Sequence, residues 1–251
     1  MSDEQILDLR RAELVLVGCG GVMFHALSQI GAVLNTVPRL EIVGIQTVDP
    51  DYIEQSNMGR QPWGEPGQSK AVLVAAYWCE LLWSVASILD RIDPLTVQLW
   101  SSSKEYAEDY RRLRRGGIVI CAPDNHEARV ATVEAIEGLG DVEQPVVLVI
   151  AGNEWTYGSA MGTYWEAGAW AADLREAHPE LMVEDDLSTH RLGCDQTPEQ
   201  SAEGNGLTGL CVARVLRDLL TKSTSYSEHG WTASEKQTVL FETIRSERQG
   251  V

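Results

Sequence analysis

A short apolar run followed by a cluster of glycines constrains the fold of this chain more than any other feature. Residues 13–17 read Glu-Leu-Val-Leu-Val and lead directly into Gly18-Cys-Gly-Gly21. Such runs are typical of strands buried on both faces of a parallel sheet. The glycines let backbone N–H groups approach a phosphate at the start of a following helix, where the helix dipole is positive. A tight turn without a ligand has the same local pattern, so this feature alone does not establish a function.

The first half of the chain continues this alternation of strand and helix. A second apolar run, residues 40–48, ends at Asp49. An acidic residue there can bind the ribose hydroxyls of a nucleotide, although an aspartate before proline is also a common turn. Further strands are predicted over residues 96–100, 118–122 and 145–150, and helices over residues 3–11, 70–89, 105–115 and 126–137. The pattern predicts an α/β fold: a Rossmann-like, mostly parallel sheet with helices on both faces.

The second half of the chain changes character after Gly152. An antiparallel strand, an apolar helix and a late strand are predicted over residues 157–165, 207–220 and 238–244, and a polar, weakly periodic segment lies between the first two. We expect this half to add antiparallel strands and a crossover loop to the same sheet. The chain is therefore predicted as one domain over 1–251, with a nucleotide-binding core at about 13–151 and an extension with a cysteine loop at about 152–251.

The charge of the chain excludes several classes of partner. It holds 20 basic and 37 acidic residues, which gives a net charge of −17. Nucleic acids and anionic membranes attract basic faces, so neither is expected as a partner. The start of the chain lacks the apolar segment of a signal peptide, and the five cysteines form no CxxC pair. These features favour a reducing, cytoplasmic setting and argue against a structural zinc.

Two later segments carry most of the residues that suggest chemistry. A long polar loop after the second strand contains Asp49, Asp51, Ser56-Asn57 and Arg60-Gln61, and Lys70-Ala71 follows it. Downstream, a strand ends in Asp124-Asn125, and Arg129 comes four residues after the asparagine. In this order the residues resemble the ThiF/MoeB/HesA family, bacterial relatives of the ubiquitin-activating enzymes. The resemblance covers about residues 14–150, and the short chain looks most like the ThiF-like protein of the PRTRC gene system.

The resemblance implies an ATP-dependent adenylyltransferase. Such an enzyme joins the C-terminal carboxylate of a small ubiquitin-like or sulfur-carrier protein to AMP and releases pyrophosphate. It also implies ATP and Mg²⁺ as cofactors and a homodimer as the assembly. The residues implied in nucleotide binding are Gly18, Gly20, Gly21, Asp49, Asn57, Arg60, Gln61, Lys70, Asp124 and Asn125.

The residue types fit this reaction, in which two anions must meet. Arg60 offers a rigid fork for phosphate oxygens, and Lys70 offers a point charge. Asn57 can hold phosphate or ribose without adding charge. Asp124, at the carboxyl end of a strand, is placed to bind Mg²⁺, which prefers carboxylate and phosphate oxygens. An Asp-Asn pair after a strand is also a common turn and helix cap.

Cys194 is the candidate nucleophile for a later thioester or persulfide step. His190 and Arg191 would lower the pKa of its thiol, whereas Asp195 would oppose them. An incidental cysteine fits the sequence equally well. With Arg60, Lys70 and Asp124, Cys194 completes the predicted catalytic set.

The family pattern is broken in places, which keeps two other functions open. Met23 stands where the third glycine of GxGGxG is expected, and the zinc-binding cysteine pairs of many relatives are absent. These departures suggest a non-catalytic scaffold that retains the fold and binds a partner. An NAD-dependent Rossmann oxidoreductase is the third alternative, because Gly18 and Asp49 alone allow it. The residues from Asn57 to Lys70 have no role in hydride transfer.

Overall fold

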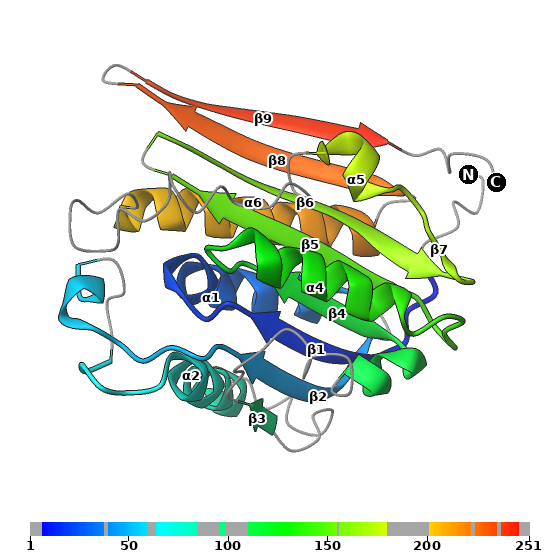
Figure 1. Cartoon of the computed structure of the whole chain (residues 1–251), viewed down its shortest axis with the longest axis horizontal. Helices are drawn as coiled ribbons and strands as arrows, with labels where there is room; N and C mark the ends of the chain where they lie inside the picture. Colours follow the sequence, from blue (N-terminus) through cyan, green and yellow to red (C-terminus); the bar gives the residue numbers. More distant parts are fainter. Residues whose placement is uncertain are drawn as a thin grey trace.

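The protein is built on one mixed sheet, seen in a computed structural model (Figure 1). The structure describes residues 7–37, 40–59, 64–84, 96–98, 110–154, 156–179, 201–221, 224–234 and 237–245. In these segments the strand order is β3-β2-β1-β4-β5-β6-β8-β9, and β7 pairs with β6. This arrangement confirms the predicted α/β fold, with the glycine turn at the end of β1.

One half of the sheet is parallel and the other half is antiparallel. The parallel strands are β1 (Arg11–Val17), β2 (Glu41–Val48), β3 (Thr96–Gln98), β4 (Gly117–Cys121) and β5 (Val146–Asn153). The antiparallel strands that follow β5 are β6 (Tyr157–Glu166), β7 (Ala169–Trp170), β8 (Tyr226–Ala233) and β9 (Thr238–Arg245). The carboxyl ends of the parallel strands meet at one edge, which is where ligands bind in sheets of this kind.

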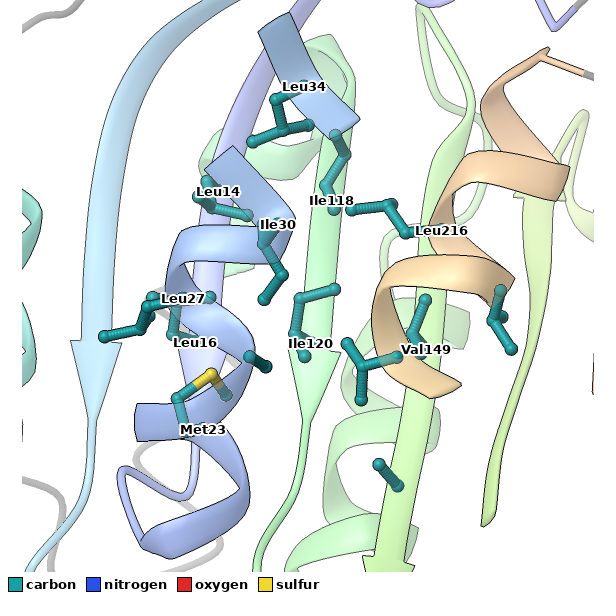
Figure 2. Close-up of a cluster of buried hydrophobic side chains, with 14 of the residues drawn as sticks. Leu14, Leu16, Met23, Leu27, Ile30, Leu34, Ile118, Ile120, Val149 and Leu216 are labelled. Atoms are coloured by element: carbon teal, nitrogen blue, oxygen red, sulfur yellow. The ribbon is translucent and has the colours of Figure 1, made fainter. Parts of the chain in front are cut away.

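Helices cover both faces of the sheet, because successive strand residues point to opposite sides. Leu14 and Leu16 of β1 pack with α1 (Gly21–Thr36), α2 (Lys70–Ser84) and α6 (Ala202–Thr221). Val15 and Val17 pack on the other face, with η3 (Tyr110–Arg115), α4 (His126–Glu137) and α5 (Leu174–Ala177). Each face therefore has its own apolar core, and Figure 2 shows part of the core under α1 and α6. No helix within the described segments is long and apolar enough to span a membrane.

Met23 occupies the position of the missing third glycine without disturbing the packing. Its side chain is fully buried and lies in the core cluster with Leu16 and Leu27 (Figure 2). Close approach of α1 occurs instead on its other side, where it packs along α6. A Cβ on Gly209 of α6 would lie 2.9 Å from the backbone nitrogen of Ala26. The glycine that permits close packing is thus supplied by α6.

Three sequence predictions of local structure differ from the structure, and some elements of the structure were not predicted. Residues 7–10 are not helical, since the N–H of Glu41 donates to the Arg10 carbonyl at 2.7 Å and holds this backbone beside β2. The predicted helix over 105–115 is a 3-10 helix in its described part, 110–115. Helix α6 begins at Ala202, five residues earlier than expected. Strand β8 was not predicted, because its buried positions include polar residues.

Candidate active site

The glycine turn is fixed by the carboxylate of Asp49. This residue follows β2 and is buried. Its Oδ2 accepts the N–H of Cys19 at 2.6 Å, and its Oδ1 accepts the N–H of Asp51 at 2.8 Å. Burial raises the pKa of Asp49, although these backbone N–H groups and nearby Lys70 oppose the rise. Asp49 therefore holds the turn in shape, and each carboxylate oxygen keeps a further lone pair that can accept a ribose hydroxyl.

The turn is also packed against the loop that carries Asp124. Gly18 has a φ of +77°, and a Cβ at this position would lie 2.5 Å from the backbone nitrogen of Pro123. The N–H of Ala122 donates to the carbonyl of Val17 at 2.8 Å. The ends of β1 and β4 are therefore in direct contact, and only glycine fits at this point of the turn.

Lys70 lies among three carboxylates at this edge of the sheet. Its Nζ donates to Oδ2 of Asp51 at 3.0 Å, and its side chain is only 14% exposed. Burial alone would lower the pKa of Lys70, but the negative charges of Asp49, Asp51 and Asp124 outweigh it and raise the pKa. Lys70 is therefore a permanent cation at neutral pH, close to the predicted Mg²⁺ ligand.

Asp124 and Asn125 have different roles in the structure. Asn125 caps α4, since its Oδ1 accepts the N–H of Ala128 at 2.8 Å. Asp124 is exposed, so its carboxylate is available to a ligand. Arg129 donates from Nη2 to the carbonyl of Pro123 at 3.0 Å and holds this loop in place.

The remaining predicted residues are placed less fully. Asn57 ends a short 3-10 helix, η1 (Gln55–Asn57), and is buried; its Oδ1 accepts the N–H of Glu54 at 2.9 Å. This contact stabilises the loop that carries it. Arg60, Gln61 and Cys194 lie outside the described residues. Of the ten predicted nucleotide-binding residues, the structure places eight at the carboxyl edge of the parallel strands or in the loop beside it.

The structure describes the side chains of three cysteines, and none of these has the properties of a nucleophile. Cys19, Cys121 and Cys211 are buried, and none of the three forms a disulfide. Burial raises the pKa of Cys19, and it raises the pKa of Cys121 and that of Cys211 to about 11. These thiols are protonated at neutral pH, so they pack as small apolar residues.

Sequence reasoning missed Asn205, a residue beside the glycine turn. It lies in the first turn of α6, is fully buried and packs against Gly21 of α1. An asparagine near a glycine-rich helix start gives no local signal of this role, because only the packing of α6 on α1 brings it to the turn.

Known proteins match this chain in fold and not in sequence. No protein-family model matches the sequence, and no curated protein sequence matches it. Solved structures match with high coverage. E. coli MccB with ATP aligns with 96% of this chain at a TM-score of 0.56 and 17% identity, and PaaA aligns with 94% at 0.58 and 14%. This chain has the fold of MccB and PaaA.

These neighbours are E1-like adenylyltransferases of the ThiF/MoeB family. MccB, a microcin C7 biosynthetic enzyme, has been solved with ATP, with AMPCPP and with MccA. The chain spans about two thirds of the length of these neighbours, 66% of MccB and 65% of PaaA. At these identities the likeness establishes the shared fold.

Proposed function

We propose that this chain uses ATP to adenylate the C-terminal carboxylate of a small ubiquitin-like or sulfur-carrier protein. The products are an acyl-adenylate and pyrophosphate. The observation that carries the proposal is the convergence of Lys70 with Asp49, Asp51 and Asp124 beside a glycine turn and a helix N-terminus. A fold shared with MccB, which has been solved with ATP, supports the same conclusion.

The reaction requires two anions to approach each other. A carboxylate oxygen forms a bond to the α-phosphorus while the bond to the bridging oxygen of the β-phosphate breaks, and the electron pair leaves with pyrophosphate. Lys70 has three N–H donors and uses one on Asp51, so others remain for phosphate oxygens. A cation held in place before the reaction stabilises charge that develops in the transition state.

The residues present fit Mg²⁺. The described segments contain no group of three His, Cys, Asp or Glu side chains placed to bind a metal. Mg²⁺ does not need such a group, because it usually takes one or two carboxylates and completes its shell with waters and phosphates. Asp124 is exposed and close enough to Lys70 to influence its pKa, so it would hold the ion against the phosphates. When bound, Mg²⁺ would neutralise phosphate charge.

Two further features support a protein or peptide substrate. MccB has been solved with AMPCPP and MccA together, so a protein of this fold binds a nucleotide and MccA at the same time. In addition, β9 forms an edge of the sheet and exposes large apolar side chains on both faces, with Val239 and Phe241 on one face and Leu240 and Ile244 on the other. Exposed apolar surface that gathers on one element marks protein contacts. A homodimer is part of the proposal on the family resemblance.

ATP–pyrophosphate exchange tests the proposal directly. With Mg²⁺, ATP, labelled pyrophosphate and a candidate carrier that ends in a glycine-rich tail, we expect label to enter ATP only when the carrier is present. Lys70→Ala and Asp124→Ala should abolish exchange. Glu127→Gln is the matched control, because Glu127 is an exposed carboxylate three residues from Asp124 and has no part in the site.

The same variants separate catalysis from a scaffold role. A scaffold would retain partner binding and cellular function in both Lys70→Ala and Asp124→Ala. Absence of ATP binding, together with absence of exchange, would refute the proposed activity. Selective binding of NAD in calorimetry would instead favour an oxidoreductase.

A further inference from the structure

The first turn of α1 leaves its N–H groups available to an anion. Its N-cap is Gly20, which has no side chain to accept them, and the first helical hydrogen bond runs from Phe24 N–H to the Gly20 carbonyl at 3.1 Å. The N–H groups of the three residues before Phe24 therefore have no acceptor within the helix. Together with the helix dipole, such groups form a site for phosphate.

Asn205 is a buried amide beside this turn that has no hydrogen-bond partner among the described residues. It has no exposed surface, and within the described segments neither its Nδ2 nor its Oδ1 is hydrogen-bonded. Its carboxamide lies against Gly21: a Cβ on Gly21 would collide with Nδ2 and would lie 3.4 Å from Oδ1. Folded proteins pair nearly all buried polar groups, because leaving one unpaired is costly. An unpaired amide at a helix N-terminus therefore points to a ligand.

We propose that Asn205 binds the phosphate chain of the nucleotide, with Nδ2 donating to a phosphate oxygen held at the start of α1. This assignment rests on the proposed function, since it requires a nucleotide at the glycine turn. An amide donates without carrying charge, so it orders the phosphate chain and leaves the neutralisation of charge to Lys70.

The fold indicates which end of the nucleotide Asn205 contacts. Asp49, the candidate ribose ligand, follows β2 on one side of α1. Helix α6 packs along the opposite side of α1, over β5 and β6 (Figure 1). A nucleotide with its ribose near β2 therefore directs its terminal phosphates toward α6. Asn205 thus contacts the β- or γ-phosphate, not the adenosine.

Calorimetry with two nucleotides tests this assignment without a carrier protein. Wild type and Asn205→Ala are titrated with AMPCPP, which retains the full phosphate chain, and with AMP, which ends at the α-phosphate. We expect Asn205→Ala to weaken AMPCPP binding roughly 10- to 100-fold, the usual effect of one hydrogen bond to a charged group, and to leave AMP binding nearly unchanged. If Asn205 had only a structural role, its replacement would weaken the binding of AMPCPP and of AMP to a similar extent.

Two more variants keep the test decisive. Cys211→Ala removes another buried side chain of α6 and should leave both affinities unchanged. If Asn205→Ala does not fold, Asn205→Ser retains one donor and should lose part of the AMPCPP affinity. Equal affinities for AMPCPP in wild type and the Asn205 variants would overturn the role of Asn205 alone. Failure of wild type to bind AMPCPP would overturn the proposed function as well.

Discussion

Replacing Gly18 by alanine tests the contact between the glycine turn and the Asp124 loop. Gly18 has a φ of +77°, a conformation that costs a residue with a side chain about 1–2 kcal/mol. The new Cβ would also lie 2.5 Å from the nitrogen of Pro123 and 2.6 Å from the carbonyl carbon of Ala122. These atoms belong to the backbone, so a rotamer change cannot relieve the overlap. Forced overlap of this kind costs about 1–3 kcal/mol more.

The expected loss for Gly18→Ala is therefore about 2–5 kcal/mol of unfolding free energy. For a chain of this size each kcal/mol lowers the melting temperature by about 2–4 °C, so we expect a fall of roughly 4–20 °C in thermal melts. Relief of the overlap must move Pro123 and with it Asp124. AMPCPP binding, measured by calorimetry with Mg²⁺, should therefore weaken in the fraction that remains folded.

Two other glycines separate the causes. Gly67 has a φ of +90°, but a Cβ there would meet nothing within 4 Å, so Gly67→Ala carries only the conformational cost. Gly20 precedes α1 with a φ of −83° and open space, so Gly20→Ala should be nearly neutral. We expect the loss to rank Gly18 above Gly67 above Gly20. If Gly18→Ala is no more destabilising than Gly67→Ala, the inferred contact with the Asp124 loop is wrong.

Four further substitutions, one of them a control, test the electrostatics. Lys70→Ala should weaken AMPCPP binding at least about 10-fold in calorimetry. Because the raised pKa keeps Lys70 charged in wild type, titration of Lys70 should not affect AMPCPP binding near neutral pH. Asp218→Ala removes the buried carboxylate whose Oδ2 lies 2.8 Å from Nε2 of His229, so we expect it to lower the unfolding free energy, measured in urea, by about 3–5 kcal/mol. Arg217→Ala is the control, because the Arg217 side chain is 49% exposed and its loss should cost less than about 1 kcal/mol. Glu228→Gln should lower the stability of the protein at pH 7, because hydrogen bonding to His178 lowers the pKa of Glu228 in the folded state. The stabilisation that the Glu228 carboxylate contributes is therefore present above its unfolded-state pKa of 4.5 and is lost as the pH falls through its folded-state pKa. A difference in melting temperature that does not change with pH would contradict this.

Local pattern was sufficient for most of the parallel half of the sheet. The helix predicted over 126–137 is α4 with the same bounds, because Asn125 caps its start and Gly138 ends it. The apolar runs at 13–17 and 118–122 correspond to β1 and β4, whose ends differ from the predicted ends by at most two residues. These elements are recognisable because both faces of their strands are buried, which requires nearly continuous apolar sequence.

Strand β8 shows where local pattern fails. Its Ser227 and His229 are buried, and both side chains hydrogen-bond to Asp218 of α6, at 3.2 Å and 2.8 Å. From sequence alone, a polar residue in a strand is predicted to be exposed unless the partner that would satisfy it in the core is known. That partner lies on a different element, so no window of sequence around β8 reveals it.

Some residues of the candidate site could likewise be predicted from local sequence, and others could not. Asp49, Lys70 and Asp124 were recognisable because each lies at a strand end or helix start, and parallel strand ends must meet at one edge. Asn205 belongs to a helix whose position depends on the close contact of Gly209 with the backbone of α1. Its approach to the glycine turn is therefore a property of the packed fold. The feature that marks Asn205 is the combination of full burial with an amide that has no partner among the described residues, and both properties arise only when α6 packs on α1.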